Sequence, residues 1–336
     1  MKEKLDYQDL QALICEYKIN LFRNDAYTRS IVLAQLDMAQ KELLARIISS
    51  DLESITKRQL DALIRDINAI VSDNYERIDS YLKKTGSELF ATAYQAEASI
   101  YNQWLGAQVF SSIPRYRLEA AQTVPLFEGR ALGDWWKRQE DDLKFKLENI
   151  IRQGNIIGDT QQNLIKQVKH SLNISRNHAE TLIRTGNAAI ANDAQEYLIE
   201  QNADLLESKQ QLSTLDSRTT DVCIVRDLRK WTIDNKPIGH DLRFRKPPLH
   251  ANCRSLIIML LKNAVLSTRA SEFGQVRGDF NYSDYLKQQS NSYQAQVLGK
   301  KRAEWFRQGK LELRQMLNQD DRSLTIKQLR DIYKLD

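Results

Sequence analysis

The chain has 336 residues, of which 42% are hydrophobic and 28% charged, a balance typical of a folded protein and not of a disordered one. Three scattered cysteines do not make a disulfide framework, which indicates a reducing compartment. The longest strongly apolar run, residues 256–261, is far below the ~20 residues that a membrane span needs. The first residues lack a signal-peptide apolar region. We therefore expect a soluble protein, made in a cytoplasm, with no membrane partner.

The first 112 residues are predicted to be helical, because they contain no proline and few glycines. Within them, apolar residues of the stretch 60–71 recur at spacings of three and four, the pattern of a helix with one buried face. Two capping boxes mark expected helix starts: Thr56 with Gln59, and Thr85 with Glu88. We expect four or five long helices in this region.

Helix breakers cluster from Pro114 to Gly133 and indicate a boundary or a long connection. Further amphipathic helices are expected from the Trp135-Trp136 pair to about Glu200. The pattern then changes to three short segments, 211–214, 230–233 and 255–261. The last two are β-branched or apolar enough for strands, so we expect a small sheet packed on helices.

Rare residue types converge between Leu215 and Arg254, which contain two of the three cysteines, two of the four histidines and three of the five prolines. Charge converges there too. From Arg226 to Arg254 the chain carries eight Lys or Arg against three Asp, an excess of five that equals the formal net charge of the whole protein. The basic character is therefore local.

This segment also carries a family resemblance. Thr-Leu-Asp-Ser-Arg-Thr at 214–219, then Cys223, then Pro-Pro-Leu-His-Ala-Asn-Cys-Arg at 247–254 resemble the core of the phage minor head proteins, the Mu F-like head morphogenesis family. Three further segments, 179–185 upstream and 297–302 and 323–329 downstream, resemble runs found in many members.

The resemblance covers about residues 150–329, and two positions depart from the family pattern. Arg226 stands where some members have the second cysteine of a C-x-x-C. Gly186 stands where members often have an acidic residue directly after the Arg-Thr pair, here Arg184-Thr185. We expect a mainly α fold with a small β-sheet, an α+β core. Its three parts are a helical N-terminal region (1–126), a compact Mu F-like core (127–265) and a C-terminal extension (266–336).

The resemblance implies a minor head protein of a tailed phage or prophage. Such proteins act in head morphogenesis, associate with the portal protein and other head proteins, and are carried inside the capsid near the portal after assembly in the host cytoplasm. Some are implicated in DNA packaging or ejection. The dinucleotide, P-loop, zinc-protease and G-x-S-x-G motifs are all absent from the sequence. We therefore expect no enzymatic activity and no cofactor.

Four side chains suit a tetrahedral zinc ion, namely Cys223, His240, His250 and Cys253. Only the last two are tightly spaced, however, and Arg226 stands where a close partner of Cys223 would be expected. The alternative is a small buried Cys223 with a hydrogen-bonded structural His250. We expect no stoichiometric zinc.

Asp216, Arg218 and Arg254 suggest a polar clamp, because an arginine fork can hold a carboxylate through two parallel hydrogen bonds. If the strand at 255–261 pairs beside 211–216, Arg254 arrives next to Asp216 and fixes the end of the sheet. An acid–base pair of Asp216 with His250 is the alternative.

The basic residues allow three interpretations: a solvated face, a surface for an acidic protein partner, or a sequence-independent contact with the phosphates of double-stranded DNA. The candidate contact residues are Arg226, Arg229, Lys230, Arg243, Arg245 and Lys246. Two competing functions follow: a metal-dependent nuclease built on Cys223, His250 and Cys253, and a DNA-binding protein that is not part of a virion.

Overall fold

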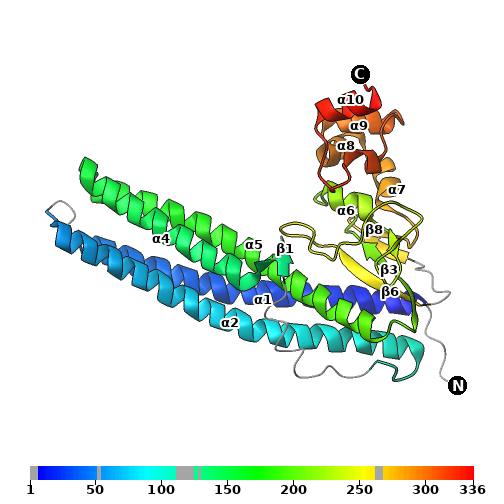
Figure 1. Ribbon diagram of the computed structural model, residues 1–336, viewed down its shortest axis with the longest axis horizontal. Helices are drawn as coiled ribbons and strands as arrows, with labels where there is room; N and C mark the ends of the chain where they lie inside the picture. Colours follow the sequence, from blue (N-terminus) through cyan, green and yellow to red (C-terminus); the bar gives the residue numbers. More distant parts are fainter. Residues whose placement is uncertain (1–6, 51–53, 111–124, 128–129, 262–267) are drawn as a thin grey trace. The chain divides into compact units, whose positions relative to one another are not determined.

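The computed structural model describes residues 7–50, 54–110, 125–127, 130–261 and 268–336, and it is mainly helical with a small antiparallel sheet, as expected (Figure 1). Spatial contacts divide the chain into two compact units, each made of separated pieces. The first unit combines Met1–Lys18, Tyr94–Ser112 and Asn192–Asp336, and the second combines Ile19–Ala93 and Ile113–Ala191. Both units cut across the three ranges expected from the sequence.

Four long helices that lie side by side supply the second unit (Figure 1). They are α1 (Tyr7–Ile48), α2 (Lys57–Leu105), α4 (Leu132–Ile157) and α5 (Gln161–Gln201), although the start of α1 and the ends of α2 and α5 belong to the first unit. The apolar residues of the stretch 60–71 face the core of the second unit, as their spacing predicts. Polar contacts join three of the helices inside this core: the hydroxyls of Tyr75 and Ser175 are 2.7 Å apart, and Trp136 Nε1 donates to the carbonyl of Tyr75 at 3.2 Å. A two-stranded pair, β1 (Pro125–Phe127) and β2 (Arg130–Ala131), precedes α4.

Residues 1–112 contain two long helices in their described part, where four or five were expected. The first capping box is confirmed: Thr56 N donates to Gln59 Oε1 at 2.9 Å just before α2. The second is wrong, because Thr85 lies inside α2 and its hydroxyl donates to the carbonyl of Tyr81 at 3.0 Å, a bond typical of a helix interior.

Gly86 does not end α2, although glycine weakens a helix. A Cβ atom at this position would lie 3.1 Å from Cδ1 of Ile190 on α5. The missing side chain therefore lets the two helices approach closely, and tertiary packing decides against the break that the local sequence favours.

The sheet of the first unit has the strand order β5-β4-β3-β6 and is antiparallel throughout. Its strands are β3 (Leu206–Leu212), β4 (Lys230–Trp231), β5 (Pro237–Ile238) and β6 (Leu256–Leu261). Leu212 pairs with Leu256, so the residues that follow β3 lie beside those that precede β6. This register brings the two halves of the rare-residue segment together.

The C-terminal segment shares one hydrophobic core with α6 (Asp221–Arg226) and β4. It contains the hairpin β7 (Thr268–Ser271) and β8 (Gly274–Arg277), then α7 (Tyr282–Lys287), α8 (Asn291–Leu298), α9 (Lys300–Arg307), the 3₁₀-helix η2 (Leu313–Met316) and α10 (Ile326–Tyr333). Buried side chains of these helices pack on Leu215, Ile224 and Trp231. The segment expected as an extension is thus part of the first unit's core. None of the described helices has the length and apolar content to cross a membrane.

Candidate functional site

The loop between β3 and α6 presents the Asp216 carboxylate to Arg254, which comes just before β6. Arg254 donates through both terminal guanidinium nitrogens, with the Nη2–Oδ1 bond at 2.8 Å. Asp216 Oδ1 also accepts from Thr219 Oγ1 at 3.0 Å and from the backbone N of Arg218 at 3.1 Å. Burial acts to raise the pKa of Asp216, but the hydrogen bonds and charge of Arg254 outweigh it and the pKa is lowered.

The expected contact between Asp216 and Arg254 is therefore present, and the predicted strand pairing produces it. Arg218 is different. Its side chain is 83% exposed, and its Nε lies 4.0 Å from Asp216 Oδ2, at the limit of an ion pair. Its backbone shapes the loop, and its guanidinium adds little.

A second buried ion pair was missed by reasoning from the sequence. The Asp227 carboxylate accepts two bonds of 2.8 Å from Arg269, one of 2.9 Å from Ser213 N and one of 2.8 Å from Tyr282 N. Both side chains of the pair are 5% exposed or less. Arg269 is 42 residues downstream in a charge-rich stretch, and no local pattern marks it. The pair joins the C-terminal segment to the sheet.

Cys223 on α6 and the turn at 250–253 form a compact cluster of two thiols and one imidazole. Cys223 Sγ lies 3.2 Å from His250 Nε2 and 3.7 Å from Cys253 Sγ. Both cysteines are free and 2% exposed. This is the one group of three or more His, Cys, Asp or Glu side chains, among the described residues, whose donor atoms could share a metal ion.

Hydrogen bonds make the two thiols of this cluster unequal. The hydrogen bond with Cys223 lowers the pKa of Cys253; burial acts against this shift, and the hydrogen bond with His250 adds to it. The pKa of Cys223 is raised, by its hydrogen bond with Cys253 and by burial. Burial acts to lower the pKa of His250, but Cys253 and the carbonyl of Ala251 outweigh it, and the pKa is raised. The cluster therefore favours negative charge on one sulfur beside an imidazole.

His240, the fourth candidate ligand, does not join this cluster. Its Nε2 lies 2.8 Å from the carbonyl of Lys230, and its Nδ1 accepts from Leu242 N at 3.2 Å. Its ring packs edge-on against Trp231, with the centroids 5.0 Å apart. These contacts give His240 a structural place beside the sheet.

The basic segment is less available than its sequence indicates. Arg226 is 0% exposed; it donates to the carbonyl of Arg243 at 2.9 Å and pairs with Asp321. The expectation that Arg226 contacts DNA or a partner is therefore wrong, because its guanidinium is enclosed by the fold. Arg245 also pairs with Asp321 at 3.1 Å.

Of the remaining candidates, Lys246 pairs with Asp193 at 2.7 Å, and Arg229 Nε donates to a backbone carbonyl. Lys230 and Arg243 are exposed. Exposed positive charge on this segment is therefore carried by Lys230, Lys236, Arg243 and Arg245, of which Arg245 is engaged by Asp321.

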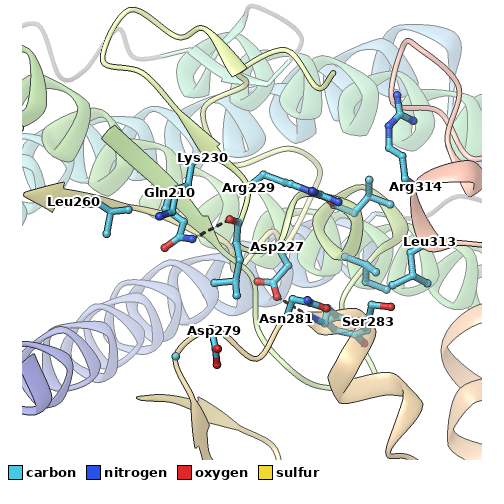
Figure 2. A pocket seen from close by; sticks show the side chains of 15 residues that line it. Gln210, Asp227, Arg229, Lys230, Leu260, Asp279, Asn281, Ser283, Leu313 and Arg314 are labelled. Atoms are coloured by element: carbon cyan, nitrogen blue, oxygen red, sulfur yellow. Dashed lines mark hydrogen bonds between the residues drawn. The ribbon is translucent and has the colours of Figure 1, made fainter. Parts of the chain in front are cut away.

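A pocket of about 400 Å³ lies in the first unit next to these residues, and Figure 2 shows the side chains that line it. Arg229 and Lys230 approach it from β4 and the preceding turn, and Asn281 and Ser283 from the start of α7. Two acidic residues stand at its wall: Asp227 is fully used by the contacts described above, and Asp279 pairs with Arg277. The pocket therefore supplies polar groups that hold the fold, and we assign it no chemistry.

Residues 145–258 match the family model described as Phage Mu protein F like protein. Neither the curated proteins nor the solved structures include a match to this chain. The matched range runs from α4 into β6 and contains Asp216, Arg254 and all three members of the cysteine–histidine cluster.

Proposed function

Because residues 145–258 belong to the phage Mu F-like family of head morphogenesis proteins, we propose that this chain is a minor head protein of a tailed phage or prophage. It is held inside the capsid near the portal and acts in head morphogenesis, with a role in DNA packaging or ejection. The family match is the observation that carries this function. The contacts of Asp216 and Asp227 fit it, since each carboxylate is held by an arginine from a distant segment and serves to fix segments together.

Docking on the portal needs an exposed surface, and the second unit offers one at the ends of its helices. Ile48 at the end of α1 is 56% exposed, and Ile156 and Ile157 at the end of α4 are 81% and 74% exposed. Gln161, which begins α5 shortly after the end of α4, donates through Nε2 to the carbonyl of Ile48 at 3.0 Å. The ends of α1 and α4 are therefore neighbours (Figure 1). Exposed isoleucines gathered in one place are typical of a protein contact. We assign the portal protein of the same phage to this surface, the isoleucine tip.

Co-expression of the full chain with that portal protein tests this assignment. We expect a complex that survives size-exclusion chromatography and that Ile156→Asp weakens at least tenfold. Gln153→Asp is the matched control, because it adds the same charge to an exposed position of the same helix without removing an apolar side chain. Equal binding by both variants would remove the isoleucine tip from the interface, and failure of the wild-type chain to bind would remove the portal as partner.

The head-protein function itself is tested in virions. Purified particles should contain the chain in few copies, and particles assembled without it should have abnormal shape or eject DNA poorly. If the chain were missing from purified virions, and its deletion left head yield and infectivity unchanged, the function would be refuted.

The alternative, a DNA-binding protein outside the virion, rests on the exposed part of the basic segment. Binding through phosphates should be indifferent to sequence and should fall steeply with salt. The double variant Lys230→Glu, Arg243→Glu tests it without breaking the ion pairs of Arg226, Arg245 and Lys246. A nuclease is less well supported, because the candidate metal cluster contains no carboxylate.

A further inference from the structure

The cysteine–histidine cluster has the dimensions of a metal site. Two thiolates bound to one tetrahedral zinc ion at about 2.3 Å each lie about 3.8 Å apart, and a thiolate and an imidazole about 3.6 Å apart. The sulfurs of Cys223 and Cys253 are 3.7 Å apart, and Cys223 Sγ is 3.2 Å from His250 Nε2. All three donor atoms lie within 4.8 Å of one another. We propose that Cys223, His250 and Cys253 bind a zinc ion, with water as the fourth ligand.

The surroundings of His250 support a ligand role. Its Nδ1 lies 2.8 Å from the carbonyl of Ala251, which can only accept, so Nδ1 carries the proton. The lone pair of the neutral imidazole is then on Nε2, which lies 3.2 Å from Cys223 Sγ and accepts from Thr220 Oγ1 at 2.8 Å in the absence of a metal. A histidine ligand whose other nitrogen donates to a backbone carbonyl is the usual arrangement at zinc sites.

Two observations made zinc unexpected from the sequence, and the fold changes both. Cys223 has no ligand close to it in the chain, but the turn at 250–253 brings two ligands to it. Arg226 stands where a close partner of Cys223 was expected, but its guanidinium is directed to the carboxylate of Asp321 and the carbonyl of Arg243. A positive charge near the cluster is thus neutralised by a partner of its own.

The donor set selects the metal. Two thiolates and one imidazole are soft and borderline ligands that favour zinc over magnesium or calcium, which prefer oxygen. Two thiolates also balance the charge of a divalent ion, so the buried site becomes neutral overall.

The zinc ion would join α6 to the turn before β6, next to the place where Arg254 joins that turn to the loop after β3. Metal binding of this kind adds directly to the stability of the folded state. The site does not depend on the proposed head function, since its metal content can be measured on the isolated chain.

The full chain, purified under reducing conditions without added metal, should contain about one zinc per chain by elemental analysis. Cys223→Ser and Cys253→Ser should each retain less than about a tenth of it. His240→Ala is the matched control, because this histidine of the same segment lies outside the cluster, and it should keep the wild-type content.

A cobalt titration of the unmodified chain, after zinc is removed with a chelator, covers the case in which the cysteine variants do not fold. Tetrahedral Co²⁺ bound to thiolates should give a sulfur-to-metal charge-transfer band that saturates at one equivalent and that added zinc abolishes. If zinc-free wild-type protein showed no such band after cobalt was added, the proposed site would be overturned. A Cys223–Cys253 disulfide, found by mass spectrometry as the loss of two hydrogens, would also overturn it, as would a zinc content unchanged in both cysteine variants.

Discussion

Arg254→Ala would remove the two guanidinium hydrogen bonds that Asp216 accepts in the loop after β3. The carboxylate would keep only its bonds from Thr219 Oγ1 and from Arg218 N. A hydrogen bond to a charged group contributes about 1.5–3 kcal/mol, and removing one partner of a buried pair costs about 3–5 kcal/mol. Because the Arg254 side chain is 23% exposed, water replaces part of what is lost. We expect the free energy of unfolding to fall by about 2–4 kcal/mol.

Urea unfolding followed by circular dichroism measures this loss, and Arg218→Ala is the matched control. Arg218 is the same residue type in the same loop, but its side chain is 83% exposed and 4.0 Å from the carboxylate, so we expect a loss below about 0.5 kcal/mol. Combining Arg254→Ala with Asp216→Asn should cost less than the sum of the single changes. If Arg254→Ala cost no more than Arg218→Ala, the two bonds would not hold the end of the sheet.

Stability should also depend on Asp216 at acid pH. Its pKa is lowered, so its contribution is complete above the ordinary aspartate pKa and is lost as pH falls through the lower folded value. Urea midpoints between about pH 6 and pH 2 should therefore fall less steeply in Arg254→Ala. Gly154→Ala should destabilise by about 1–3 kcal/mol in thermal unfolding, because its Cβ would lie 2.1 Å from Leu164 Cδ2. Arg226→Ala should cost about 2–4 kcal/mol in urea unfolding, because it leaves a buried carboxylate with one partner fewer.

Each of these changes has a control in the chain. Arg218→Ala should keep the wild-type acid dependence. Gly133 is in the same helix as Gly154, and a Cβ at this position would lie at an ordinary 3.9 Å from Asp79 Oδ1. Gly133→Ala should therefore be near neutral or stabilising. Lys230→Ala removes an exposed cation of the same segment as Arg226 and should cost less than about 0.5 kcal/mol. Equal losses within any of these pairs would contradict the assigned contact.

Much of the fold followed from local patterns in the sequence. Apolar spacing in residues 60–71 predicted a buried helix face, and the short apolar segment ending at Leu261 predicted a strand. The contact of Asp216 with Arg254 could also be predicted, because it needs only the pairing of two strands that flank the motif. In each case the determining residues are close in the chain, or their pairing follows from strand register alone.

Other features depend on partners that the sequence does not place. In the sequence, Arg226 is one more cation in a basic run. Its burial depends on its ion pair with Asp321, which is 95 residues away in the chain. Thr85 and Gly86 favour a helix boundary locally, but packing on α5 keeps α2 continuous. The pairing of Cys223 with the turn at 250–253 likewise exists only after the chain folds. Local sequence sets which elements form, whereas burial and charge pairing are properties of the space between elements, and only the tertiary structure decides them.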